Sequence, residues 1–358
     1  MVKAAAFVVP GDLATPTGGY AYDRRIVAEL RALGWQMQVL DIGEGFPNPT
    51  AAARSAAQRS IAALAAEHPI VIDGLAFGVL AAEALALAPG RTLVALVHHP
   101  LALESGLSAA QSAALRASEC AALACASHVI ATSPSTAQLL RADFAVAPQR
   151  LSIVRPGTDR VAVTPRVPGA TVELLAVGSV VPRKGYDLLV AALARISDLA
   201  WRLTIAGDRE RSRETAQLID ADIARLGLVE RVRFVGAVPT QALMELYAAA
   251  DLFVLPSRFE GYGMAYAEAI AHGLPVVGTR AGAIPDTVPA GAGVLVPPDD
   301  VGALAAVLRH LIGSRSERER LAVGARAAAA AFPSWRDSAA LFARVLDQVA
   351  QPVAGPAP

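Results

Sequence analysis

Short apolar segments alternate with helical segments along almost the whole chain of 358 residues, and this alternation is the strongest constraint on its fold. Each apolar segment has the length of a strand and is followed by a stretch with helical periodicity. Such strand–helix units build parallel sheets that helices cover on both faces. The strand-like segments are residues 4–9, 35–40, 70–72, 92–97, 128–131, 172–177, 202–206, 231–235, 252–255 and 275–277. We therefore predict an α/β fold with two doubly wound, Rossmann-like domains.

A proline-rich stretch interrupts the alternation between residues 155 and 168 and indicates a linker. We predict an N-terminal Rossmann-like domain over residues 1–165 and a C-terminal one over residues 166–335. Residues 336–350 are predicted to form a helix that packs back on the N-terminal domain, and residues 351–358 a disordered tail. In such sheets ligands bind at the carboxyl ends of strands, so we expect the ligand site in the cleft between the domains.

The charge balance excludes one class of partner. The 32 Lys and Arg residues equal the 32 Asp and Glu residues, which argues against a protein that binds nucleic acid by neutralising phosphates.

No apolar run reaches the roughly 18 residues that a membrane span needs, and the first residues resemble a strand rather than a leader peptide. We expect a cytoplasmic protein with at most peripheral contact at the inner face of the membrane.

Residues 256–269 say most about the ligand. They follow a strand, and their glycines allow the backbone to approach a ligand closely. A helix that begins near Gly263 would direct its first N–H groups and its dipole at an anion. Glu260 precedes this helix, and Glu268 lies about one and a half turns into it. Two carboxylates can thus bracket a ligand with an anionic middle and hydroxyls at its ends, which is the layout of a sugar–diphosphate–ribose molecule.

A second strand–loop–helix segment, residues 174–185, contains Gly178, Arg183 and Lys184. Two cations at the start of a helix oppose its dipole, so they are unfavourable there unless an anion binds. A diphosphate would supply that anion, with Arg bound as a fork and Lys as a point charge. Lysine is rare in this chain, since Lys3 is the only other one. We therefore predict a phosphate-binding loop.

Candidate residues also follow strands in the N-terminal domain. Gly18 and Gly19 open a helix, where backbone N–H groups can meet a phosphate or an acceptor. His98 and His99 follow the strand at residues 92–97, and if the strand continues through them, alternation places their side chains on opposite faces. We favour His98 as the residue that faces the cleft. The residues predicted for the acceptor side are His99, Thr132 and Ser133.

The spacing of Glu260 and Glu268, with the surrounding Glu-Gly-Tyr-Gly-Met and Glu-Ala-Ile-Ala-His-Gly-Leu-Pro-Val-Val, resembles the signature of the retaining GT-B glycosyltransferases of family 4, also called glycosyl transferases group 1. The Arg-Lys-Gly loop and the Gly-Gly loop are similar to other elements of that family. The resemblance covers nearly the whole chain and is densest over residues 174–300. It implies that the first glutamate contacts the transferred sugar, that the second holds the ribose hydroxyls, and that a histidine lies near the reacting carbon.

The resemblance implies a GT-B enzyme of the hexosyltransferase type, with polysaccharide biosynthesis as a family-level expectation. It would transfer a sugar from a nucleotide diphosphate sugar to a glycan or glycolipid with retention of configuration. The implied catalytic residues are His98, Glu260, Arg183 and Lys184. The implied donor-binding residues are Gly18, Gly19, Gly178, Arg183, Lys184, Val238, Glu260, Gly263, Met264, Ala265 and Glu268.

We expect no cofactor and no metal. The Asp-Ala-Asp of residues 220–222 lies inside a predicted helix, where it is read as solvated surface rather than as a cation site. The resemblance implies that the phosphate itself accepts the acceptor's proton, so that no protein nucleophile is required. This fits the sequence, from which no carboxylate of the N-terminal domain can be assigned to the cleft. Two alternatives stay open: a GT-B epimerase or hydrolase that acts on nucleotide sugars, and a non-enzymatic protein that binds them.

Overall fold

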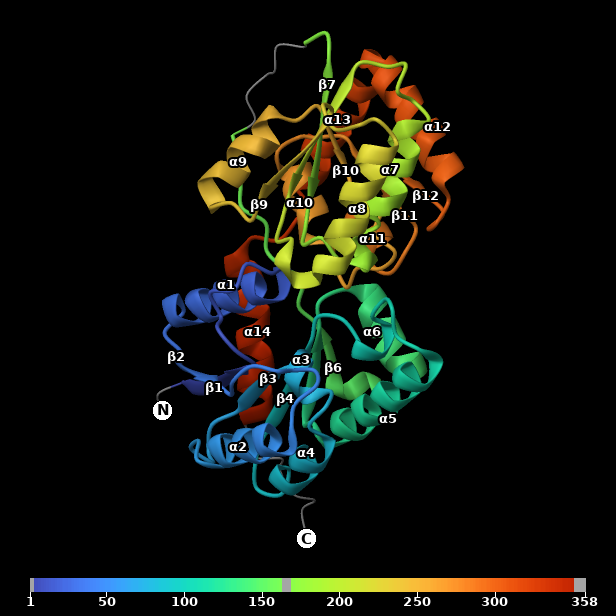
Figure 1. Ribbon diagram of the computed structural model, residues 1–358. Helices are drawn as coiled ribbons and strands as arrows, with labels where there is room; N and C mark the ends of the chain where they lie inside the picture. Colours follow the sequence, from blue (N-terminus) through green and yellow to red (C-terminus); the bar gives the residue numbers. More distant parts are fainter. Residues whose placement is uncertain (1–2, 163–168, 351–358) are drawn as a thin grey trace. The chain divides into compact units, whose positions relative to one another are not determined.

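The computed structural model describes residues 3–162 and 169–350 (Figure 1). The chain forms two compact units. The first unit consists of two segments, the residues up to Gly157 and those from Pro333 onward. The second unit runs from Thr158 to Phe332. The predicted domain boundary at residue 165 and the predicted tail at residues 351–358 lie outside the described residues.

The first unit contains a parallel sheet of six strands in the order β2-β1-β3-β4-β5-β6. The central strands are apolar and fully buried, as expected for a sheet covered on both faces. The strands are β1 (Ala4–Val9), β2 (Gln36–Asp41), β3 (Ile70–Asp73), β4 (Leu93–Val97), β5 (His128–Ala131) and β6 (Leu151–Ile153). The helices are α1 (Gly18–Ala32), α2 (Ala51–Ala62), α3 (Gly74–Phe77), α4 (Ala81–Leu87), α5 (Ala109–Cys125), α6 (Pro134–Asp143) and α14 (Trp335–Ala350), with 3₁₀ turns η1 (Leu101–Leu103) and η2 (Pro148–Arg150).

Helix α14 belongs to the first unit although it comes last in the chain. It packs along α1, and the ring of Phe342 lies 6.4 Å from that of Phe7 on β1. At its start, the ring of Trp335 lies edge-on to Tyr22 of α1 at 6.0 Å. The apolar face of this helix therefore completes the core of the first unit.

The second unit contains another parallel sheet of six strands, in the order β12-β11-β10-β7-β8-β9. Helices lie on both sides of this sheet (Figure 1). The strands are β7 (Val172–Val177), β8 (Trp201–Ala206), β9 (Val232–Gly236), β10 (Leu252–Val254), β11 (Val276–Thr279) and β12 (Gly293–Val296). The helices are α7 (Tyr186–Ala194), α8 (Arg213–Arg225), α9 (Thr240–Ala249), α10 (Met264–Ala271), α11 (Ile284–Thr287), α12 (Val301–Gly313) and α13 (Arg315–Ala329), with 3₁₀ turns η3 (Pro182–Lys184) and η4 (Glu210–Ser212).

The predicted fold class is confirmed, and every strand predicted from the sequence is present within one or two residues. Two edge strands, β6 and β12, were not predicted. Both are short and partly exposed, so they lack the continuous apolar run that marks the central strands. Arg183 and Lys184 were expected in a helix, but they lie in the turn η3, and Gly185 separates them from α7. Within the described ranges no helix is long and apolar enough to cross a membrane.

Candidate functional site

Two loops of the second unit bring three predicted residues together. The loop after β7 carries Arg183 and Lys184, and the loop after β10 carries Glu260. Arg183 Nη1 donates to Glu260 Oε2 at 3.1 Å and to the carbonyl of Phe259 at 2.7 Å. Lys184 Nζ donates to Glu260 Oε1 at 2.7 Å. The two cations of the predicted phosphate loop therefore meet the first glutamate of the predicted signature.

Glu260 is buried and firmly held. Burial acts to raise its pKa, but the charges of Lys184 and Arg183 outweigh burial and hold the pKa of Glu260 at about 2. Ser257 also donates to Glu260 Oε1, at 2.7 Å. Glu260 is therefore ionised at neutral pH, and both of its oxygens are oriented. Ser257 was not identified from the sequence, although its place in the same loop, three residues before Glu260, was the available signal.

The close contact of these loops depends on Gly185. This residue has a φ of 69°, and a side chain on it would overlap the carbonyl oxygen of Pro256. Arg258 joins the loops as well. Its guanidinium binds both oxygens of Asp187 at 3.0 and 2.6 Å, and its backbone N–H donates to the carbonyl of Arg183 at 2.7 Å. The position of the two cations relative to Glu260 is thus fixed by backbone contact and by an ion pair.

Helix α10 begins where the sequence predicts it. Gly263 precedes the helix with a φ of 87°, a left-handed conformation that favours glycine. In the described part of the chain, the backbone N–H groups of Met264 and Ala265 have no hydrogen-bond acceptor. Unsatisfied N–H groups at a helix start, together with the dipole, form a site for an anion.

Glu268 lies inside α10 and is half-buried. Tyr247 donates a hydrogen bond from its hydroxyl to Glu268 Oε2 at 2.8 Å, and His272 stacks on the ring of Tyr247 at 4.9 Å. Burial raises the pKa of Glu268 to about 7, and the charge of Asp159 acts in the same direction. Unlike Glu260, this carboxyl group therefore titrates near neutral pH.

Two other residues of this unit that were predicted to bind the donor, Gly178 and Val238, differ in their position relative to Lys184 and Glu260. Gly178 has a φ of 152° and lies under the side chain of Lys184, which a side chain at Gly178 would meet at 3.0 Å. Its carbonyl accepts a hydrogen bond from Tyr186 at 2.7 Å. Val238 lies in the loop between β9 and α9, outside the cluster around Glu260.

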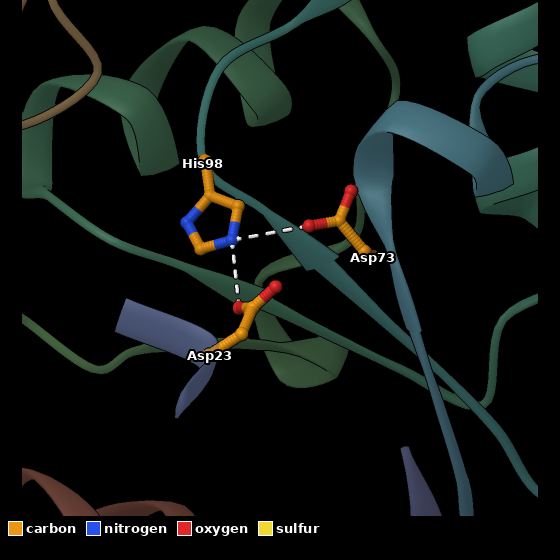
Figure 2. A group of neighbouring side chains, drawn as sticks. All are labelled: Asp23, Asp73 and His98. Carbon is orange, nitrogen blue, oxygen red and sulfur yellow. Dashed lines mark hydrogen bonds and ion pairs between the residues drawn. The ribbon is translucent and has the colours of Figure 1, made fainter. Parts of the chain in front are cut away.

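In the first unit, His98 follows β4 and lies between two aspartates. Its Nε2 is 3.0 Å from Asp23 Oδ1 and 3.4 Å from Asp73 Oδ2 (Figure 2). Gly18 and Gly19 begin α1, and a side chain at Gly19 would meet the His98 ring at 3.4 Å. The Gly-Gly loop and His98 are therefore neighbours in this unit.

The sequence did not identify Asp23 and Asp73, the two carboxylates of this unit that lie beside His98. Asp73 ends β3, so the strand-end argument that selected His98 could have selected it too. Asp23 lies on α1 and had no comparable signal. Among the described residues, Asp23, Asp73 and His98 form the one group of three or more histidine, cysteine or acidic side chains whose ligand atoms all lie within 4.8 Å of one another.

The residues predicted for the acceptor side occupy different environments. His99 Nε2 lies 3.6 Å from Glu104. Thr132 is buried and donates a hydrogen bond to the carbonyl of His98 at 3.3 Å. Ser133 is buried at the start of α6, where its Oγ accepts from the N–H of Thr136 at 3.0 Å. The hydroxyls of Thr132 and Ser133 thus contribute to the structure of the first unit, and an acceptor role for these residues stays a prediction.

Comparison with known proteins decides the family. Residues 22–161 match the family described as Glycosyltransferase Family 4, and residues 171–314 match Glycosyl transferases group 1. The chain is 30% identical over 325 residues to the MMP alpha-(1->4)-mannosyltransferase of Mycolicibacterium hassiacum, covering 87% of this chain and 77% of that protein. The chain belongs to glycosyltransferase family 4. It is accordingly an enzyme of the glycosyltransferase class, as predicted.

Other members of the family are similar over shorter stretches. The D-inositol 3-phosphate glycosyltransferase 1 of Catenulispora acidiphila is 33% identical over 243 residues, which are 62% of this chain and 57% of that protein. The match therefore spans little more than half the length of that relative. The Mannosylfructose-phosphate synthase of Agrobacterium fabrum is 33% identical over 174 residues, covering 44% of this chain and 38% of that protein.

Solved structures confirm the GT-B fold. The sucrose-phosphate synthase of Thermosynechococcus elongatus has a TM-score of 0.84 at 22% identity, and covers 97% of this chain and 99% of that one. Anabaena HepE in complex with UDP and glucose has a TM-score of 0.78 at 20% identity, and covers 97% and 100%. At these identities the likeness establishes the fold alone.

Proposed function

We propose that this glycosyltransferase takes a sugar from a nucleotide diphosphate sugar and transfers it with retention of configuration. One observation carries the proposal: Arg183 and Lys184 converge on Glu260 in a loop that leads directly into the open N-terminus of α10. Two cations and a helix start together form a site for a diphosphate. The family supports the same assignment, since its members are sugar transferases.

The diphosphate would share the two cations with Glu260. Charged hydrogen bonds of this kind contribute about 1.5–3 kcal/mol each. Because negative charge grows on the diphosphate as the sugar departs, Arg183, Lys184 and the N–H groups of Met264 and Ala265 would bind the transition state more strongly than the ground state. This difference in binding is the catalytic contribution that we assign to the second unit.

The two glutamates would recognise the two ends of the donor. Glu260 is ionised and oriented, so it can accept hydrogen bonds from hydroxyls of the transferred sugar. Glu268 can accept hydrogen bonds from the ribose hydroxyls once it is ionised. We propose that the acceptor attacks from the face that the diphosphate leaves, with a phosphate oxygen taking the acceptor's proton. No protein nucleophile and no metal take part in this reaction.

We propose a glycan or a glycolipid as the acceptor, as the family resemblance implies. A glycolipid acceptor would bring the enzyme to the inner face of a membrane. The relatives named for D-inositol 3-phosphate and mannosylfructose-phosphate add a second class, the phosphorylated polyols and sugars. An acceptor panel should therefore contain both classes.

The donor is tested by a thermal-shift screen with UDP-, GDP- and ADP-sugars. A ligand that binds only the folded protein stabilises it, by about 2.7 kcal/mol at one hundred times its Kd. We expect one base to raise the melting temperature clearly above the other two, and the same nucleotide sugar to support transfer. An epimerase would instead release altered free sugar without an acceptor product. A screen in which no nucleotide sugar raises the melting temperature would contradict the proposal.

Metal independence is tested separately, in the transfer assay with the donor that the screen selects. We expect EDTA to leave the transfer rate unchanged, and the product to have the anomeric configuration of the donor. Proton NMR of the product reports the anomeric configuration directly. Loss of activity in EDTA that Mg²⁺ or Mn²⁺ restores would contradict metal independence, and an inverted product would contradict retention.

A further inference from the structure

His98 uses one edge of its ring for contacts inside the protein. Both carboxylates approach the same atom, Nε2, as the two dashed lines in Figure 2 show. A neutral histidine carries one N–H, which is on either nitrogen, and the partners decide which. With two carboxylates at Nε2, that nitrogen must carry a proton and donate it inward.

Other contacts fix the orientation of the same ring. Gly19 lies against the Cδ2 edge, where a side chain would come within 3.4 Å. Tyr22 packs edge-on with its ring centre 5.1 Å from that of His98. Among the described residues no hydrogen bond is formed by Nδ1 of His98, and the side chain remains 21% exposed. The Nδ1 edge is therefore the part of the ring that is left for a ligand.

The two aspartates are themselves fixed. Asp73 accepts the backbone N–H of Leu75 at 2.6 Å on its other oxygen, which orients the carboxylate at the start of α3. Asp23 is fully buried on α1, and its Oδ2 is a buried oxygen without a hydrogen-bond partner in the described structure. A buried carboxylate with so few donors around it is costly unless a positive charge lies beside it.

The positive charge is available from His98. Burial alone would lower its pKa, but the charges of Asp23 and Asp73 outweigh burial and raise the pKa of His98 to about 10. Burial raises the pKa of Asp23 to about 7, while the hydrogen bond with His98 lowers that of Asp73 against the effect of burial. Tyr22 also faces the cluster and stays neutral, because burial raises its pKa well above the ordinary value.

We propose that Asp23 and Asp73 are positioning residues for His98: they hold its ring as an imidazolium with Nε2–H directed inward, so that Nδ1–H donates a hydrogen bond to an oxygen of the substrate. This inference rests on the proposed function, because the oxygen that Nδ1–H binds belongs to a substrate of the proposed reaction. An imidazolium has no lone pair on either nitrogen. His98 is therefore a charged hydrogen-bond donor in the reaction and not a general base.

The decisive measurement is NMR of the protein labelled with ¹⁵N-histidine. The chain has six histidines, and the His98→Gln variant identifies the signals of His98. We expect both ring nitrogens of His98 to stay protonated from pH 6 to pH 8.5. In Asp73→Asn and Asp23→Asn, loss of an adjacent opposite charge should lower the pKa of His98 by about 1–3 units. A wild-type His98 that is neutral at pH 7.5 would overturn the proposal, whether or not the protein transfers sugar.

The pH profile of kcat/KM separates a positioning role from a merely structural one. In the Asp73→Asn and Asp23→Asn variants, activity should fall as pH rises through the lowered pKa of His98, while the wild type keeps its activity. Glu119→Gln is the matched control, because Glu119 is a buried carboxylate that binds the backbone N–H groups of Leu101 and Ala102 rather than His98. A glutamine has one acceptor oxygen for these two N–H groups, so the variant should lower stability and leave the shape of the pH profile unchanged. Aspartate variants whose profiles keep the wild-type shape would overturn the inference.

The substrate contact is tested on the same NMR signals. A shift of Nδ1 with the nucleoside diphosphate alone identifies a phosphate oxygen as the acceptor of the hydrogen bond. A shift that needs the intact nucleotide sugar, or its acceptor, identifies a sugar hydroxyl. No shift with any of these ligands would overturn the contact. Loss of the Nε2–H signal on addition of Zn²⁺ alone at stoichiometric concentration would overturn the imidazolium. If the thermal-shift screen finds no donor, the proposed function fails, while the pH titration of His98 still tests the imidazolium.

Discussion

Lys184→Ala is expected to lower kcat/KM by on the order of 10²–10³-fold while the protein stays folded. The loss should appear in kcat as well as in donor affinity, because Lys184 faces the charge that grows on the departing diphosphate. The donor-induced rise in melting temperature should shrink in the same variant. Steady-state kinetics and the thermal-shift assay measure both effects.

The ligand-free protein explains why this variant can stay folded. Without Lys184, Glu260 still binds Arg183 at 3.1 Å and Ser257 at 2.7 Å, so no carboxylate is left buried and alone. The reverse change is more damaging, because Glu260→Ala leaves two cations facing each other without their shared anion. We therefore choose the lysine, and not the glutamate, to separate catalysis from stability.

The chain offers a matched control for this variant. Lys3, the only other lysine, forms an ion pair with Asp347 at 2.7 Å, and its side chain is 53% exposed. Exposed pairs of this kind contribute about 0–1 kcal/mol, so Lys3→Ala should leave both the kinetics and the donor response unchanged. Wild-type donor binding in Lys184→Ala would contradict the assignment of the phosphate loop.

Much of the second unit's candidate site could be predicted because its residues follow strands. Arg183, Lys184 and Glu260 lie in loops at the carboxyl ends of β7 and β10, and β7 and β10 are neighbours in the sheet. The strand pattern thus brings these loops together before any side-chain contact is known. Gly263 and the start of α10 were predictable as well, because a glycine next to a helical pattern marks a helix boundary.

Residues whose role depends on tertiary packing could not be found in this way. Asp23 reaches His98 from the middle of a helix, and Tyr247 reaches Glu268 from α9 across to α10. Neither spacing nor periodicity links these pairs, which are 75 and 21 residues apart. The shifted pKa values of His98 and Glu268 follow from the same contacts and from burial, so they too need the structure.

Glu268→Gln is expected to weaken donor binding and, at the same time, to stabilise the protein at alkaline pH. Burial raises the pKa of Glu268 from 4.5 to about 7. Between these two values the folded state holds a proton that the unfolded state has lost. The stability associated with this group is therefore complete below about pH 4.5, and is lost as pH rises through 7.

A glutamine has no charge to bury, so the variant avoids this loss. At pH 8.5 it should be more stable than the wild type, by on the order of 2 kcal/mol, with a smaller difference at pH 5. Its amide oxygen can still accept the hydrogen bond from Tyr247. It cannot accept from both ribose hydroxyls as a carboxylate does, so donor affinity should fall by about 10–100-fold, the equivalent of one or two hydrogen bonds.

Urea unfolding at the two pH values and donor titration at pH 8.5 measure the two effects. Wild-type donor affinity should itself improve as pH rises through 7, because only the ionised Glu268 accepts hydrogen bonds from both hydroxyls. Glu245→Gln is the control, since Glu245 is an exposed residue of α9, two positions from Tyr247. It should change neither stability nor affinity. A Glu268→Gln variant that gains stability at pH 8.5 and still binds the donor as the wild type does would contradict the ribose assignment. The ionised carboxylate of Glu268 would then lower the stability of the folded protein without contributing to donor binding.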